Sequence, residues 1–276
     1  MLTALLQDAR DTPTQEDEHN TMDSTAFTGV SLRGSLAAFL HDKVYRNIFA
    51  IIAAVCALFV AFTTLAMALY PGGAGPIRFT HGYLFFVNTF SDLGQIHTQS
   101  GASNYPSMLL FTTAMVTVGL GLGAFFVAFA RFFHAHSPAL WARRANLSAT
   151  LVGVVAALGF VGVGLTPHDR FFLQHQAVTQ WTFRLLLVAM ILEMVALRLE
   201  RRMPVSLLRV NTAFVIVLAG YLMVMFFGPS PANLIGTEVH AVSQKLIVYT
   251  SIGVIFAQAL LVRTHMARLL PAVIAE

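Results

Sequence analysis

The chain has 276 residues, of which 57% are hydrophobic and only 11% are charged. Soluble domains carry roughly 25% charged residues, so this chain cannot cover a water-exposed surface and a soluble fold is excluded. The net charge of +4 comes without a basic patch interleaved with aromatic residues, so nucleic acid is not an expected partner. Cys56 is the only cysteine, which excludes a disulfide within the chain.

The first 44 residues differ in composition from the rest of the chain. Residues 1–30 carry seven charged side chains, six of them acidic, and they lack the basic start and apolar core of a signal peptide. We expect them to form an acidic, loosely attached arm. Residues 31–44 place four apolar side chains on one helical face, namely Leu32, Leu36, Phe39 and Leu40. This pattern is typical of a short amphipathic helix that lies in the membrane interface.

Six mainly apolar segments follow, each long enough to cross a bilayer, which takes about 20 helical residues. They cover residues 46–70, 107–133, 145–166, 176–199, 205–228 and 240–264. Because lipid-exposed backbone must satisfy its own hydrogen bonds, these segments are predicted to be helices. The predicted fold class is therefore an all-α integral membrane protein, a six-transmembrane-helix bundle over residues 45–265 with a cytoplasmic tail at 266–276. Small residues such as Gly119 and Gly123 would let the helices approach closely.

The basic residues near the ends of these segments are unevenly distributed. Twelve of them lie on one side of the predicted bundle, and only three lie on the other: Arg78, Arg170 and Lys245. Cytoplasmic loops of membrane proteins carry the excess of arginine and lysine. We therefore expect both termini to be cytoplasmic and the loops at 71–106, 167–175 and 229–239 to face outward.

Polar side chains gather at the predicted outer ends of the spans, beginning with the stretch "NTFSDLGQIH" at residues 88–97. An acidic side chain beside apolar "YLFFV" needs hydrogen-bonding partners if the segment is buried. We therefore expect Ser91 and Asp92 to fold inward over the bundle, within reach of His175 or His240. The candidate residues for an outward polar cavity are Ser91, Asp92, His168, Asp169, His175, Arg184, His240 and Gln244.

Several kinds of site fit this set. The side chains could simply form hydrogen bonds between loops and helix ends, or they could bind a lipid headgroup or another small ligand. A metal is the third alternative, and zinc would be held by Asp92, His175 and His240, because imidazole and carboxylate ligands suit that ion. No HxxxH or HExxH pair supports the metal. A bis-histidine haem would need deep histidines on facing helices, and no second pair lies at the inner end.

Two charged residues lie inside the fourth predicted span, Arg184 and Glu193. We expect Arg184 to neutralise Asp92 or Asp169, or to hold a lipid phosphate. Glu193 lies nearer the cytoplasmic end, where Arg198 or Arg209 could form an ion pair with it.

Three motifs carry a resemblance to a known family: "SDLG" after the first span, "GVGLTPHD" followed by "QHQAV", and "EVHAVSQKLIVY" at the start of the sixth span. Over residues 45–265 the chain resembles the bacterial six-span family known as domain of unknown function 998, which is similar to the FRAG–DRAM–Sfk membrane proteins. The resemblance implies a six-helix bundle in the bacterial inner (plasma) membrane, with a polar outward face and a link to lipid handling. The serine, aspartate and histidines are also similar to those of the seven-span alkaline ceramidases, although the span count and the missing HxxxH pair depart from that pattern.

These observations favour a membrane protein associated with lipids or with a membrane protein partner, with an outward-facing polar cavity. An extracytoplasmic metal-dependent hydrolase of a lipid amide or ester is an alternative. An accessory subunit of a larger membrane complex is another, because lipid-facing and protein-facing apolar surfaces look alike in sequence.

Overall fold

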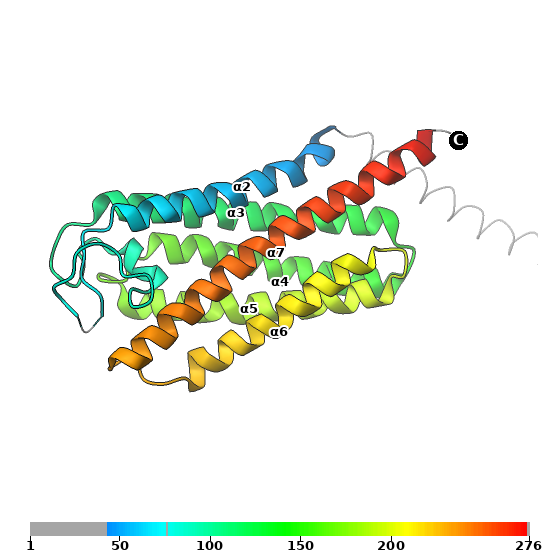
Figure 1. Cartoon of the computed structure of the whole chain (residues 1–276). Coiled ribbons are helices and arrows are strands. Elements are labelled where there is room, and N and C mark those ends of the chain that lie inside the picture. Colours follow the sequence, from blue (N-terminus) through cyan, green and yellow to red (C-terminus); the bar gives the residue numbers. More distant parts are fainter. Residues whose placement is uncertain (1–42, 76, 275–276) are drawn as a thin grey trace, which may run out of the picture.

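The computed structural model describes residues 43–75 and 77–274, and it shows an all-α bundle (Figure 1). The long helices are α2 (Lys43–Ala68), α3 (Tyr105–His136), α4 (Leu140–Leu165), α5 (Phe172–Leu199), α6 (Val205–Phe227) and α7 (Leu234–Ile274). A short 3-10 helix, η1 (Phe90–Gly94), lies between α2 and α3. The predicted acidic arm, and all but the last two residues of the predicted interfacial helix, lie outside the described residues.

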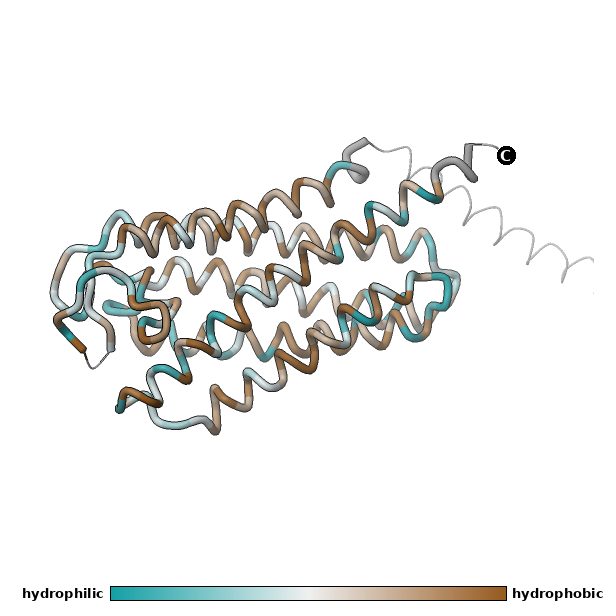
Figure 2. Tube along the Cα trace, in the orientation of Figure 1, coloured by the Kyte–Doolittle hydropathy of each residue, from teal (hydrophilic) through white to brown (hydrophobic). Residues whose placement is uncertain are grey.

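Five of the six long helices are long and apolar enough to cross a membrane, and α5 is not among them. Each helix coincides closely with a predicted span except α7, which begins at Leu234 and continues to Ile274, through most of the predicted tail. Figure 2 shows apolar residues along the helices and hydrophilic residues concentrated in the loops at the two ends. The protein is therefore a multi-pass membrane protein by helix length and hydropathy.

Helices that follow one another in the chain pack side by side, and α7 packs back against α2 to close the bundle. Five phenylalanines of α3 lie in the core with at most 1% of their surface exposed: Phe125, Phe126, Phe129, Phe132 and Phe133. Glycine faces one of these rings. A Cβ atom at Gly153 of α4 would lie 2.5 Å from the ring of Phe126, so a larger residue there would displace the ring.

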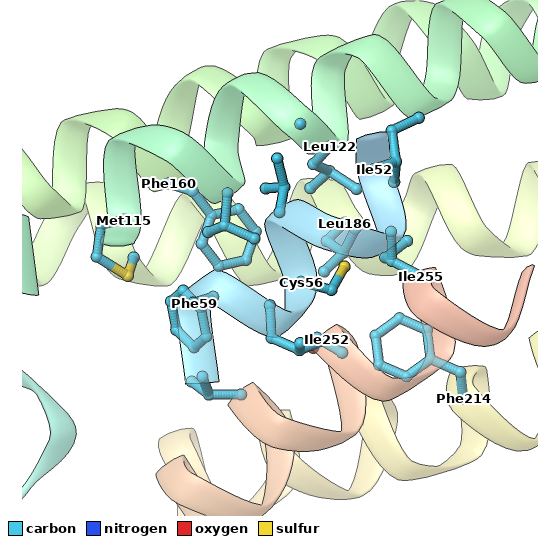
Figure 3. A pocket seen from close by; sticks show the side chains of 15 residues that line it. Ile52, Cys56, Phe59, Met115, Leu122, Phe160, Leu186, Phe214, Ile252 and Ile255 are labelled. Carbon is cyan, nitrogen blue, oxygen red and sulfur yellow. The ribbon is translucent and has the colours of Figure 1, made fainter. Parts of the chain in front are cut away.

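A small apolar cavity lies in the centre of the bundle, bordered by residues of all six long helices (Figure 3). Its volume is about 30 Å³, and Cys56, Phe59, Phe160 and Leu186 are among the side chains that line it. Pockets that hold drug-sized ligands measure roughly 300–1,000 Å³. This cavity is therefore too small to hold an acyl chain.

Residues 69–104, here called the cap, cover one end of the bundle (Figure 1). Glycines with positive φ allow its tight turns, among them Gly72 at +130° and Gly73 at +95°. A Cβ atom at Gly72 would lie 1.9 Å from the carbonyl oxygen of Thr80, so no other residue fits there. The opposite end of the bundle, here called the basic end, contains the loops 137–139 and 200–204 and the C-terminal part of α7.

Candidate functional site in the cap

The cap is anchored by η1, whose apolar side chains enter the end of the bundle. The ring of Phe90 packs 6.0 Å from that of Phe59, 6.0 Å from that of Phe111 and 5.6 Å from that of Tyr249. Leu93, one turn later, is fully buried. Because Ser91 and Asp92 lie between these two anchors, burial of the anchors brings both polar side chains beneath the cap, as the sequence predicts.

Asp92 is 5% exposed, and four donors surround its carboxylate. The Nδ2 atom of Asn88 donates at 3.0 Å, the backbone N–H and hydroxyl of Thr89 both donate at 2.9 Å, and Nε2 of Gln95 donates at 3.3 Å. Burial raises the pKa of Asp92 above its usual value, and the hydrogen bonds from Asn88 and Thr89 oppose part of that rise. All four of these groups donate to the carboxylate, which is the environment of a carboxylate anion.

A buried lysine on α7 provides the nearby positive charge. The ammonium group of Lys245 donates to the carbonyl oxygens of Asn88 and Ala241. It also lies 5.2 Å from the ring of Tyr83 and 5.1 Å from that of Phe85, close enough for cation–π attraction. Lys245 thus links α7 to Asn88, whose side chain also donates to Asp92.

Ser91 and His175 form a hydrogen-bonded pair between the cap and α5. The Ser91 Oγ atom lies 3.0 Å from His175 Nε2, and His175 Nδ1 lies 2.7 Å from the carbonyl oxygen of Thr166. A carbonyl can only accept, so the Nδ1 atom carries the proton and Nε2 accepts from the serine hydroxyl. Gln244 supports the pair, since its Nε2 donates to Ser91 Oγ at 3.2 Å and its Oε1 accepts from the Phe90 N–H at 2.8 Å.

A surface pocket opens beside this pair, here called the cap pocket. Its lining residues are Gln95, His97, Thr98, Gln99, His168, Asp169 and Phe172. His168 lines this pocket, and its ring lies 5.2 Å from that of His175. The pocket therefore lies next to the Ser91–His175 pair. Burial lowers the pKa of His168, and the charges of Asp92 and Asp169 only partly oppose this. A neutral imidazole is therefore the form that the pocket favours.

Two polar groups set the character of the pocket floor. Gln95 is 1% exposed, and its Nε2 lies 3.3 Å from Asp92 Oδ1 and 3.4 Å from His168 Nδ1. The Gln95 Oε1 atom is buried without a hydrogen-bond partner among the described residues. Asp169 joins the pocket to the cap, because its two oxygens accept from the backbone N–H groups of Ile96 and His97 at 2.9 and 3.1 Å. The floor thus offers an unused acceptor from an amide.

Six of the eight predicted site residues meet in this region: Ser91, Asp92, His168, Asp169, His175 and Gln244. Arg184 does not join them. Its guanidinium carbon lies 5.0 Å from the centre of the Trp181 ring and 4.3 Å from that of Phe226, so it stacks on aromatic rings. The expected pairing of Arg184 with Asp92 or Asp169 is not found, since both carboxylates bind donors of the cap instead.

The predicted zinc ligands do not form a binding group. Among the residues that the structure describes, no cluster of three His, Cys, Asp or Glu side chains could hold a metal ion. The reason is local: His240 Nε2 faces the carbonyl oxygen of Pro229 at 2.9 Å, and His175 Nε2 faces Ser91. The set Asp92, His175 and His240 is therefore not assembled here.

Glu193 also has a different partner from the one expected. It is 1% exposed, and its Oε1 atom accepts a hydrogen bond from Gln258 Nε2 of α7 at 3.2 Å. The pairing with Arg198 or Arg209 is wrong, because Glu193 faces the bundle interior.

The predicted site residues leave out four residues that build the site: Tyr83, Asn88, Gln95 and Lys245. Asn88 and Gln95 belong to the same polar stretch as Ser91 and lie four and three residues from Asp92. This spacing, together with the need of a buried acid for donors, is the signal that could have added them. The sequence placed Lys245 among the basic residues of the outer side, and the structure shows that it is buried there, with 2% of its surface exposed.

Comparisons with known proteins give this site no relative. No protein-family model, no curated protein and no solved structure matches the chain. The resemblance to the family of unknown function 998 stays a prediction.

Proposed function

We propose that this protein is a six-span membrane protein that binds the polar head of a membrane lipid in its cap pocket. The observation that carries the proposal is Gln95, whose amide is fixed by Asp92 and His168 while its buried Oε1 remains free to accept. A ligand hydroxyl or amide N–H would complete that contact. We place the protein in the bacterial inner membrane, with the cap and its pocket outside.

The sixth span in this proposal is α5. It has 28 residues, about 42 Å of helix at 1.5 Å per residue, and it packs against both α4 and α6. If its two neighbours cross the bilayer, α5 crosses with them. The excess of arginines at the basic end supports an orientation with that end in the cytoplasm.

The chemistry of the pocket favours an uncharged, hydrogen-bonding headgroup. Its amides, a hydroxyl and a neutral His168 offer donors and acceptors, and the carboxylate of Asp169 is already bound to backbone. An apolar surface adjoins it, because Phe171, Phe172 and Leu173 are 49, 51 and 74% exposed. A molecule with a polar head and a hydrocarbon tail matches both surfaces, since such exposed rings suit the membrane interface.

Native mass spectrometry of the full-length protein, released from a mild detergent, tests the proposal. We expect the wild type to retain a lipid with an uncharged headgroup, and the double variant His97→Ala/Gln99→Ala to lose it. Both side chains are exposed on the pocket rim, so the fold should persist. His81→Ala, an exposed histidine of the cap outside the pocket, is the matched control. Equal lipid retention by all three proteins would overturn the proposal.

A second candidate function follows from the Ser91–His175 pair, which has the geometry of a nucleophile and its general base. In this candidate the Ser91 hydroxyl gives its proton to His175 Nε2 and attacks the carbonyl of a lipid ester. The alcohol then leaves with that proton, and water hydrolyses the acyl-serine. The Thr166 carbonyl would orient the imidazole, a role that a carboxylate fills in many hydrolases. Burial weighs against this function, since Ser91 is 7% and His175 4% exposed.

A fluorophosphonate probe decides between the two functions. Covalent labelling of the wild type that is lost in Ser91→Ala, with ester hydrolysis lost in parallel, would establish the hydrolase. Lipid retention without labelling would leave binding as the function.

A further inference from the structure

Arg184 of α5 carries a positive charge that no acid in the described part of the chain neutralises. Its guanidinium carbon lies 5.0 Å from the centre of the Trp181 ring and 4.3 Å from that of Phe226. Among residues 43–75 and 77–274, Arg184 makes these two ring contacts but no side-chain hydrogen bond or ion pair. A guanidinium has five N–H donors, so the side chain has donors to offer to a ligand.

The depth of Arg184 in the membrane follows from its contact with Phe226. Helix α6 ends at Phe227, and the loop 228–233 that follows is exposed throughout. Irregular backbone exposed to lipid does not occur within the hydrocarbon region, so this loop lies among the headgroups or beyond them. The guanidinium therefore lies near the boundary between hydrocarbon and headgroups, on the cap side of the bilayer.

Trp181 supports this depth. It is 57% exposed, and exposed tryptophans are enriched at the level of lipid headgroups. It precedes Arg184 by about one turn of α5 and so lies toward the cap. Because cation–π attraction to two rings holds the guanidinium at this level, little side-chain freedom remains to be lost when a ligand binds.

Apolar side chains continue from Arg184 toward the centre of the bilayer. Val188 follows it by one turn of α5 and is 46% exposed, whereas Met223 precedes Phe226 by about one turn of α6 and is 58% exposed. The two helices are consecutive and pack against each other, so both side chains lie deeper than the guanidinium. From the centre of the bilayer outward, this surface changes from apolar to basic, as a phospholipid changes from acyl chain to phosphate.

Phosphate is the membrane ligand that suits this side chain. The planar fork of arginine donates two parallel hydrogen bonds to phosphate oxygens, and its weak hydration favours such contacts away from bulk water. An unpaired charge at the edge of the hydrocarbon is costly, and a lipid that brings a negative charge to the guanidinium lowers that cost.

We propose that Arg184 binds the phosphate of an anionic phospholipid in the leaflet on the cap side. Trp181 and Phe226 hold the guanidinium in place, and an acyl chain of the lipid lies along Val188 and Met223. The inference uses the proposed passage of α5 through the bilayer. It is independent of the lipid proposed for the cap pocket, which has an uncharged head.

Quenching of tryptophan fluorescence by brominated lipids tests this site, because the chain contains only two tryptophans. Trp141→Phe leaves Trp181 as the reporter in the full-length protein, reconstituted in dioleoyl phosphatidylcholine vesicles with increasing amounts of brominated phosphatidylglycerol. We expect phosphatidylglycerol to be preferred over phosphatidylcholine at Trp181 by about fivefold, the selectivity that one arginine confers near anionic lipid. Arg184→Gln in the same background should remove this preference.

Two control variants separate this site from the rest of the protein. Arg263→Gln removes the same charge from an exposed position of α7 at the basic end, and it should keep the preference. His97→Ala/Gln99→Ala, which alters the cap pocket, should keep it as well. Failure of this inference can therefore be told from failure of the proposed function.

Arg184→Lys covers the case in which Arg184→Gln does not fold. It keeps the charge but not the planar fork, so its preference for phosphatidylglycerol should fall below that of the wild type. The proposal is overturned if Arg184→Gln, or Arg184→Lys in its place, keeps the wild-type preference, or if Arg263→Gln loses it equally. It is likewise overturned if inorganic phosphate at constant ionic strength removes the preference, since the arginine would then bind a free anion.

Discussion

The cap and the membrane core each bury one carboxylate, and they treat it in opposite ways. In the cap, Asp92 accepts four hydrogen bonds, from Asn88, Thr89 and Gln95, with the ammonium of Lys245 held on the Asn88 carbonyl. In the core, Glu193 has one donor, Gln258. The cap is therefore built to hold a charge, whereas the core tolerates a polar group with little provision for one.

The unmatched atoms in the core complete the contrast. Glu193 Oε2 and Gln258 Oε1 are both buried without a partner among the described residues. Two acceptors cannot bond to each other, but a protonated Glu193 could donate from Oε2 to the amide oxygen. One proton would then satisfy both atoms in a cyclic acid–amide pair. The cap thus stabilises its acid with hydrogen-bond donors alone, whereas the core pairs its acid with an amide that can both donate and accept.

The largest effect should follow from Asp92→Asn, which has nearly the same shape as the wild type but replaces an acceptor oxygen by an NH₂ group. Whichever oxygen is replaced, donors of the cap lose their acceptor, and the charge of Lys245 loses its compensation. Unsatisfied buried donors cost roughly 1–3 kcal/mol, so we expect the Tm in detergent to fall by about 5–10 °C. An unchanged Tm would mean that the carboxyl is already neutral, and the contrast between cap and core would fail.

The next largest effect concerns packing. Packing stabilises the core, whereas hydrogen bonds stabilise the cap. A Cβ atom at Gly119 would lie 2.8 Å from the Ala157 carbonyl oxygen, whereas one at Gly123 would lie 3.7 Å from the Ala157 Cβ. Gly119→Ala should cost about 1–3 kcal/mol through overpacking. Gly123→Ala, the matched control, should be neutral or slightly stabilising. Equal melting temperatures of the two variants would show that α3 and α4 separate easily.

A smaller effect is expected from pH at the cap pocket. Since burial lowers the pKa of His168, its contribution to stability is present above the unfolded pKa of about 6.5. It is lost as the pH falls through that value toward the folded pKa. Wild-type protein should therefore lose more Tm between pH 7.5 and 5.5 than His168→Asn, which keeps an acceptor near the Nδ1 position. Parallel Tm–pH curves of the wild type and His168→Asn would show that His168 is not the source of the pH dependence.

The smallest effect is predicted for Glu193→Gln. The new side chain can donate to Gln258 Oε1 and accept from Gln258 Nε2, so it reproduces the proposed acid–amide pair without titrating. We expect a change in unfolding free energy of less than about 0.5 kcal/mol, within the range of neutral substitutions. A loss as large as that of Asp92→Asn would show that Glu193 carries a charge, and the two regions would no longer differ.

The helices of the core could be predicted from the sequence, because hydrocarbon requires about 20 apolar residues and tolerates few charges. The inward folding of Ser91 and Asp92 was also predictable, since the apolar residues on either side of them demand burial and a buried acid demands donors. Both predictions depend on residue composition and on the free-energy cost of burying polar groups. Both quantities can be read from the sequence.

The partners within the site were not predictable in the same way. The Asn88 and Thr166 carbonyls hold Lys245 and His175, and a backbone carbonyl has no signature in a sequence. Arg184 and His240 lie on the expected helices, but their side chains contact aromatic rings and the Pro229 carbonyl instead. Depth follows from hydropathy, whereas the direction of a side chain follows from packing.

The length of α7 has a consequence for how the protein sits in bilayers of different thickness. Its 41 residues extend about 60 Å at 1.5 Å per residue, against a hydrocarbon thickness of about 30 Å. Figure 1 shows the helix running obliquely across the bundle, so tilt absorbs part of the excess. Lys245 fixes the helix at the cap, and adjustment must therefore occur at the other end, where exposed Arg263 and Arg268 can remain in water. A thicker membrane would be matched by drawing further turns of α7 into it, while the cap pocket keeps its height above the lipid.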